Sequence, residues 1–303
     1  MGYTCQYKNG ATITILVPYD CNNNCPFCVN KADYRDKYKN KDIDKVMKDM
    51  IRLDRITPNC DYVFSGGEPF ANFEQLERLL ETVREINKNG GNHKLFINTT
   101  FPVFTEEDTN KALKICEAYR DVITGLNISR HLRKYVRECP DDVLYKLKDM
   151  GMSIRINTVV YRNGDLENLD AHLERFKDFQ IQIREDYTKC KIESLHDYYE
   201  EDGLLQSVLR AMHQEFDDKN FLFRNDFRWN YILQTKANGK TITLHRTLPY
   251  SVIKTDDGQE EINDIIIEPT GLVATDWNDY GHEIDFDEYN RCMQMKKTLK
   301  PNN

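Results

Sequence analysis

The residues best suited to chemistry are three cysteines that fall within eight positions of one another. Cys21, Cys25 and Cys28 have the spacing C-x3-C-x2-C, in an asparagine-rich loop that follows the apolar segment 11–18. Thiolates are soft ligands that suit zinc and iron–sulfur clusters. Three thiolates in one short loop can hold three irons of a cubane cluster, which leaves the fourth iron open to a substrate or cofactor.

Two other interpretations of these cysteines stay open. A structural zinc site takes four protein ligands, so Cys5 or a histidine would have to complete the set. Three unrelated buried cysteines are the second alternative, although the Asn-Asn-Asn run and Pro26 between them are typical of a polar loop. The other six cysteines are scattered, and most are interpreted as small buried apolar residues.

A second motif follows the next predicted strand, 61–65. It reads Ser65-Gly66-Gly67-Glu68-Pro69. Glycines let a ligand approach the backbone closely, and Glu68 offers a carboxylate to an ammonium group. Taken alone, the motif would equally fit an ordinary loop before a helix.

The two motifs together, on successive loops, resemble those of the radical S-adenosylmethionine (SAM) superfamily, and the resemblance covers roughly residues 11–190. It implies that Cys21, Cys25 and Cys28 ligate a [4Fe–4S] cluster. It also implies that Phe27, just before the third cysteine, packs near the SAM adenine. The resemblance implies further residues that contact SAM. By motif these are Gly66, Gly67, Glu68 and Pro69, and by position at a strand end they are Ser129, Asn157 and Arg184.

Some of these assignments have alternatives in ordinary structure. Ser129 and Asn157 would also fit strand-end hydrogen bonding, and Arg184 would also fit a substrate contact. No catalytic acid, base or hydrogen donor is identified from the sequence.

The resemblance also implies the chemistry. A member of this superfamily cleaves SAM reductively to a 5′-deoxyadenosyl radical, which abstracts hydrogen from a substrate, and it needs a one-electron reductant such as flavodoxin or ferredoxin. The subfamily stays open, with some similarity to viperin-like and MoaA-like members, and the substrate stays open among a nucleotide, a peptide and a small metabolite. The non-enzymatic alternative is a zinc- or cluster-stabilised binding module without turnover.

The elements that must position these residues alternate between strands and helices. Strands are predicted at 11–18, 61–65, 93–98, 122–129, 153–161 and 180–185, with helices at 43–53, 72–90, 105–119, 141–150, 166–179 and 204–216. Such alternation implies parallel strands with helical crossovers. The predicted fold is α/β, a partial (β/α)6 TIM-type barrel, whose chemistry belongs at the C-terminal ends of its strands.

The pattern changes after about residue 220. Two hairpins are predicted, one at 229–245 around Asn238-Gly239 and one at 262–276 around Thr270-Gly271. We therefore expect two parts: a barrel core at 1–220, and a β-rich extension at 221–303 that covers the barrel mouth.

Composition excludes several classes of protein. The net charge of −8 argues against a dedicated nucleic-acid binder. No apolar run approaches the ~18 residues that a membrane span needs, and the N-terminus lacks the pattern of a signal peptide. The sequence thus predicts a cytoplasmic protein.

Overall fold

The computed structural model describes residues 12–16, 21, 23–28, 41–56, 60–101, 105–186, 204–211, 221–224, 230–237, 240–247, 252–254, 260–262 and 264–274. The strands in the N-terminal two thirds are β1 Thr12–Ile15, β2 Asp61–Phe64, β3 Leu95–Thr99, β4 Ile123–Ser129, β5 Ser153–Val160 and β6 Gln180–Glu185. The later strands are β7 Phe221–Arg224, β8 Asn230–Ala237, β9 Lys240–Thr247, β10 Val252–Lys254, β11 Glu260–Ile262, β12 Asp264–Ile267 and β13 Val273–Ala274. The helices are α2 Ile43–Ile56, α3 Phe73–Lys88, α4 Glu106–Ala118, α5 Asp141–Asp149, α6 Leu169–Arg175 and α8 Leu204–Ala211, with 3₁₀ helices η1 Pro69–Ala71 and η2 Asn163–Asn168.

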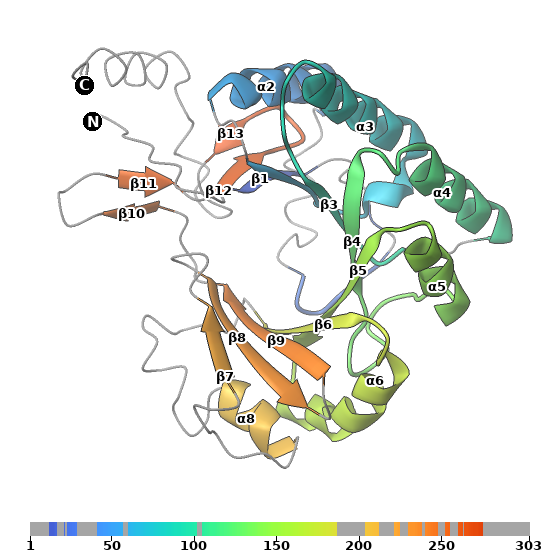
Figure 1. Ribbon diagram of the computed structural model, residues 1–303, viewed down its shortest axis with the longest axis vertical. Helices are drawn as coiled ribbons and strands as arrows, with labels where there is room; N and C mark the ends of the chain where they lie inside the picture. Colours follow the sequence, from blue (N-terminus) through green and yellow to red (C-terminus); the bar gives the residue numbers. More distant parts are fainter. Residues whose placement is uncertain are drawn as a thin grey trace.

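Strands β1 to β6 lie side by side in chain order and are all parallel. A helix follows each of the first five strands, and these helices, α2 to α6, cover the outer side of a curved sheet (Figure 1). The predicted β/α alternation and the mostly parallel sheet of a partial barrel are therefore confirmed.

The strands beyond residue 220 join the same sheet at both of its ends. Strand β9 pairs in parallel with β6, and β12 pairs in parallel with β1, with Ile13 opposite Ile265. The two predicted hairpins are present as the antiparallel pairs β8–β9 and β12–β13. Strand β7 and the separate β10–β11 pair were not predicted. The division at residue 220 and the covering of the barrel mouth stay predictions.

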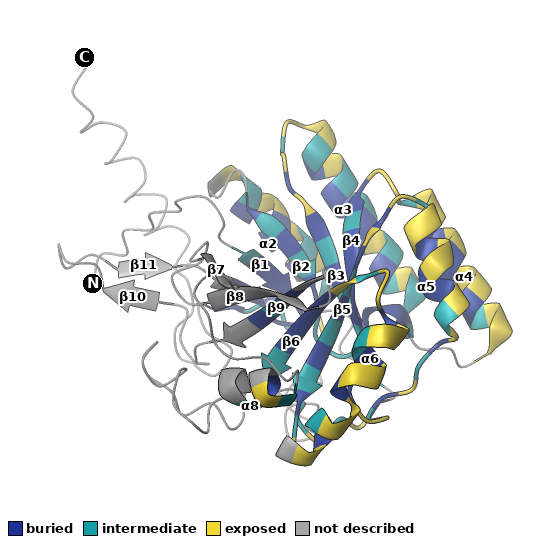
Figure 2. Cartoon of the chain, turned by 60° about the horizontal axis from the view of Figure 1, so that its bottom comes forward, coloured by how far each residue is buried: buried dark blue, intermediate teal, exposed yellow. Residues whose placement is uncertain are grey.

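Local sequence explains where the helices begin and which face they bury. The side chain of Asn72 caps α3, because its Oδ1 accepts a hydrogen bond from the backbone N of Gln75 at 3.1 Å. Thr105 caps α4 in the same way through the backbone N of Asp108. Outward helix faces are exposed, whereas the strands behind them are buried (Figure 2). Among the described helices, none has the length and apolar character needed to cross a membrane.

The two faces of the sheet differ in chemistry. On β5, Ile154 and Ile156 belong to the buried core, and the hydroxyl of Thr158 contacts Nε2 of His172 on α6 at 2.8 Å. Because side chains alternate along a strand, Arg155 and Asn157 face the other side. We call this side the concave face. By the same alternation, its polar residues on β3 to β6 include Asn98, Asn127, Arg155, Asn157, Gln182 and Arg184.

Candidate functional site

The cysteine loop leaves the C-terminal end of β1, at the edge where a parallel barrel carries its chemistry. Cys21, Cys25 and Cys28 are partly buried free thiols. The backbone N of Cys28 donates to the carbonyl of Cys25 at 3.1 Å, and the backbone N of Asn23 donates to Sγ of Cys21 at 3.4 Å. These two hydrogen bonds help to fix the backbone at both ends of the motif.

The three thiols influence one another electrostatically. Burial, as the largest cause, and the nearby thiols of Cys28 and Cys21 together raise the pKa of Cys25 to about 12. No three His, Cys, Asp or Glu side chains within the described ranges are grouped so as to hold a metal ion. The donor set, three thiols in one loop, is nevertheless of the kind that ligates iron–sulfur clusters.

The Gly-Gly-Glu-Pro loop packs directly against the chain that leads to the cysteines. The backbone N of Ser65 donates to the carbonyl of Ile15 at 2.9 Å. Gly66 has a φ of +105°, and a Cβ placed on it would lie 2.8 Å from the carbonyl carbon of Leu16. Only glycine fits here, so this residue allows the loops after β1 and β2 to touch.

Glu68 is buried, and its carboxylate accepts four hydrogen bonds from the protein. Oε2 accepts from the backbone N and the hydroxyl of Thr100, both at 2.8 Å, while Oε1 accepts from Thr99 Oγ1 and from the backbone N of Phe70. Burial raises the pKa of Glu68, and these four donors act against that rise. Two carboxylate oxygens offer about four acceptor positions. The four protein donors occupy these positions, and the contact of Glu68 with a ligand ammonium group stays a prediction.

Thr100, at the C-terminal end of β3, joins the loops together. Its Oγ1 also accepts from Nδ2 of Asn23 at 3.1 Å, and its carbonyl accepts from Nη1 of Arg130 at 2.8 Å. We call Asn23, Glu68, Thr100 and Arg130 the Thr100 hub. It ties the cysteine loop, the Gly-Gly-Glu-Pro loop and the ends of β3 and β4 into one hydrogen-bonded unit.

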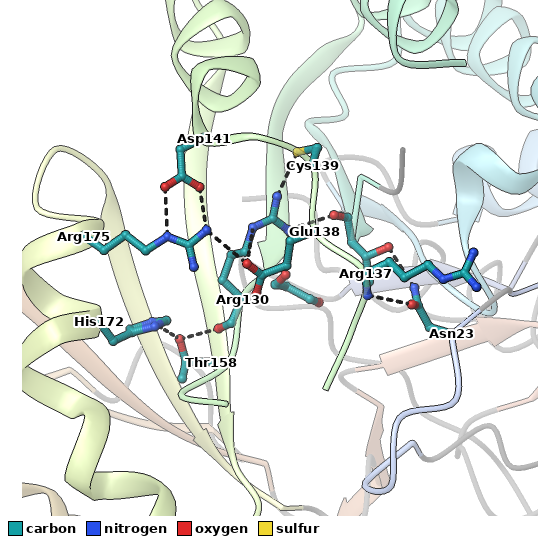
Figure 3. A network of polar contacts seen from close by, with 11 residues as sticks. Asn23, Arg130, Arg137, Glu138, Cys139, Asp141, Thr158, His172 and Arg175 are labelled. Carbon is teal, nitrogen blue, oxygen red and sulfur yellow. Dashed lines mark hydrogen bonds and ion pairs between the residues drawn. The ribbon is translucent and has the colours of Figure 1, made fainter. Parts of the chain in front are cut away.

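Through Arg130 the hub continues into a network of polar contacts that includes Cys139, Glu138 and Arg175 (Figure 3). Arg130 is fully buried, and its Nη2 donates to Sγ of Cys139 at 2.8 Å. Its Nε lies 4.0 Å from Glu138, which is ion-paired with Arg175. At the cysteine end, Oδ1 of Asn23 accepts from the backbone N of Arg137 at 3.0 Å, so the loop is also tied to the segment after β4.

Phe27 lies in an aromatic cluster. Its ring centroid is 4.6 Å from that of His131, 5.7 Å from Tyr135 and 5.9 Å from Tyr161. Burial lowers the pKa of His131 to about 3, and its Nδ1 accepts from the backbone N of Val159. His131 is therefore neutral at physiological pH, so the ring of Phe27 packs against an uncharged side chain.

The three strand-end residues lie on adjacent strands. Ser129 on β4 is the register partner of Asn157 on β5, and Arg184 on β6 is the register partner of Val159. Oδ1 of Asn157 is buried and has no hydrogen-bond partner in the described part of the chain. Ser129 and Asn157 are thus neighbours, as their places in the sequence predicted, and Arg184 follows on the next strand.

Sequence reasoning missed three members of the Thr100 hub. Asn23 sits inside the cysteine motif, and Thr100 and Arg130 directly follow the ends of β3 and β4. Polar residues just past the C-terminal ends of parallel strands are a recognisable signal. That signal could have marked Thr100 and Arg130 as candidates, but not which loops they join.

Comparison with known proteins finds a match that includes the cysteine loop. Residues 9–133, which include all three cysteines of the motif, match the family model described as a 4Fe-4S single cluster domain. An uncharacterized protein of Methanocaldococcus jannaschii is 29% identical over 177 residues, which cover 56% of this chain and 59% of that protein.

Solved structures share the fold. SuiB of Streptococcus suis bound to S-adenosylmethionine matches with a TM-score of 0.51 at 12% identity, over 88% of this chain and 58% of that chain. A second SuiB structure matches with a TM-score of 0.50 at 14% identity, over 88% and 60%. This chain therefore covers less than two thirds of the SuiB chain. The comparisons thus show similarity to a 4Fe–4S single cluster domain over residues 9–133 and a shared α/β fold.

Proposed function

We propose that this protein is a radical SAM enzyme in which Cys21, Cys25 and Cys28 ligate a [4Fe–4S] cluster. The observation that carries the proposal is the match of residues 9–133 to a 4Fe–4S single cluster domain, because those residues include the three cysteines. The donor chemistry fits as well, since a thiol whose pKa is raised to about 12 becomes a thiolate readily only when a cation binds it.

The chain's own residues would hold SAM at the same edge of the sheet. Phe27 and its aromatic cluster offer an apolar wall for the adenine. Backbone carbonyls of Gly66 and Gly67 would accept from the SAM ammonium group, while Glu68 and Pro69 keep that loop in place. The ribose and carboxylate would meet the strand-end residues Ser129, Asn157 and Arg184.

Bound cluster and SAM together would supply a 5′-deoxyadenosyl radical for hydrogen abstraction from a substrate. The protein contributes positioning and the exclusion of water and oxidants. A one-electron reductant such as flavodoxin or ferredoxin would be the redox partner. Free thiols and an oxygen-sensitive cluster favour a reducing, cytoplasmic location. The substrate class stays open among nucleotides, peptides and small metabolites.

Anaerobic reconstitution with iron and sulfide tests the proposal. The purified protein is loaded, assayed for iron and sulfide, then reduced with dithionite in the presence of SAM, and 5′-deoxyadenosine is measured by mass spectrometry. We expect about four irons per chain and formation of 5′-deoxyadenosine.

Two matched variants sharpen the test. Cys25→Ala should abolish 5′-deoxyadenosine formation, whereas Cys116→Ala, at a buried cysteine of α4 outside the motif, should retain it. Zinc in place of iron, without SAM cleavage, would refute the proposal and leave a metal-stabilised binding module.

A further inference from the structure

A row of polar side chains crosses the concave face below the strand ends. Nδ2 of Asn98 donates to Ser65 Oγ at 3.4 Å, and Nδ2 of Asn127 donates to Oδ1 of Asn98 at 2.8 Å. The next residue across the sheet is Arg155, the register partner of Asn127. The row therefore runs from the Gly-Gly-Glu-Pro loop on β2 to a guanidinium group on β5.

The guanidinium of Arg155 is not fully paired within the described part of the chain. Its Nε is buried without a hydrogen-bond partner, and no ion pair reaches it from the described residues. Burial lowers the pKa of Arg155 to about 10, with no neighbouring acid to counter the effect. Arg155 is partly exposed as a whole residue, but its Nε is buried. A largely buried charge is costly unless it is paired, so this arginine is a candidate for ligand binding.

Asp186, which directly follows β6, lies far from Arg155. The register partner of Arg155 is Gln180, and Asp186 lies six residues farther along that strand, which is about 20 Å. Arg184, a second guanidinium, also lies between them. Among the described residues, no carboxylate counters the lowering of the pKa of Arg155.

Two carboxamides beside Arg155 are also incompletely bonded. Asn157, two residues along β5, and Gln182, its register partner on β6, each carry a buried side-chain oxygen without a hydrogen-bond partner among the described residues. Gln182 is only 2% exposed. The concave face thus carries one unused donor, Nε of Arg155, and two unused acceptors, Oδ1 of Asn157 and Oε1 of Gln182.

We propose that Arg155 binds an anionic group of the substrate, a phosphate or a carboxylate, while the buried side-chain oxygens of Asn157 and Gln182 accept hydrogen bonds from donor groups of the same substrate. This inference rests on the proposed function, because it assigns the substrate class of the same site. Arg155 lies about 6.6 Å farther from the C-terminal end of β5 than Asn157. A substrate anchored there would extend along the concave face toward the strand ends, where the cluster and SAM are proposed to bind.

Anion titration of the reconstituted, SAM-bound protein tests the site. Tripolyphosphate stands for a nucleotide phosphate and tricarballylate for a carboxylate, and binding is measured by isothermal titration calorimetry under anaerobic conditions. We expect one of the two anions to bind the wild-type protein. Arg155→Met should weaken that binding at least tenfold, and Arg155→Lys should restore part of it. Arg120→Met, at an exposed arginine after α4, should match the wild type.

A second readout separates a ligand-binding role from a structural one. Thermal unfolding of Arg155→Met in the absence of anions should occur at an equal or higher temperature than in the wild type, because the variant removes an unpaired buried charge. A clearly lower unfolding temperature would assign Arg155 to the fold and overturn the inference. Binding of neither anion, or unchanged binding by Arg155→Met, would overturn it too. Iron content and 5′-deoxyadenosine formation, measured on the same wild-type preparation, report separately on the proposed function.

Discussion

Replacing Thr100 with valine removes one hydroxyl group and nearly preserves the volume of the side chain. That hydroxyl donates to Oε2 of Glu68 at 2.8 Å and accepts from Nδ2 of Asn23 at 3.1 Å. A hydrogen bond to a charged group contributes about 1.5–3 kcal/mol and a neutral one about 0.5–1.5 kcal/mol. Because Glu68 and Asn23 are both buried, neither group regains a water molecule easily. We therefore expect Thr100→Val to lower the free energy of unfolding by about 2–4 kcal/mol.

Urea unfolding of the metal-free protein, followed by circular dichroism, measures this loss. Thr100→Ser keeps the hydroxyl and serves as the control, with an expected change below about 1.5 kcal/mol for the lost methyl group. The same variants should differ after reconstitution, because the hub fixes the cysteine loop against the Gly-Gly-Glu-Pro loop: the valine variant should bind SAM more weakly. A valine variant within 0.5 kcal/mol of the serine variant, a difference typical of neutral surface changes, would refute the description of Thr100 as a hub.

Two further predictions concern stability. Gly66→Ala should lower the free energy of unfolding more than Gly90→Ala does: both glycines have positive φ, +105° and +103°, but only at Gly66 would the new Cβ meet backbone, that of Leu16 at 2.8 Å. Equal losses in urea unfolding would show that the close approach carries no cost. Acidification should also destabilise the protein, since burial lowers the pKa of His172 from 6.5 to about 4. The unfolded chain then binds the proton first as pH falls from 6.5 to 4, so the free energy of unfolding should drop by up to about 3 kcal/mol, and His172→Gln should flatten this part of the pH profile.

The order of the sheet was only partly predictable from the sequence. Apolar alternation and helix caps such as Asn72 and Thr105 are local signals, and they correctly gave the strands β1 to β6 and the helices between them. Boundaries were less certain: the helix expected at 166–179 is the 3₁₀ helix η2 followed by α6. The parallel pairing of β12 with β1 was missed because no local pattern encodes which distant strand fills an edge.

The candidate site, too, was only partly predictable from the sequence. Cysteine spacing and the Gly-Gly-Glu-Pro string are visible along the chain, so Cys21, Cys25, Cys28 and Gly66 could be proposed as site residues directly. The hydrogen bonds that Glu68 accepts could not be predicted, because they depend on the donors that Thr99 and Thr100 bring to it. Arg155 was part of a strand pattern, and only its isolation from acidic partners in three dimensions makes it a binding candidate.

The pairing of β1 with β12 has a consequence for the order in which the chain folds during synthesis. Strand β1 leads into the cysteine loop, yet one of its two neighbours comes from Asp264–Ile267, far along the chain. Synthesis on the ribosome proceeds from the N-terminus, so one edge of β1 stays open until that late segment emerges. Strand pairs that are distant in sequence also form slowly. We therefore expect iron loading of the cysteine loop to follow translation rather than accompany it, on a scaffold that one of the last strands of the chain makes complete.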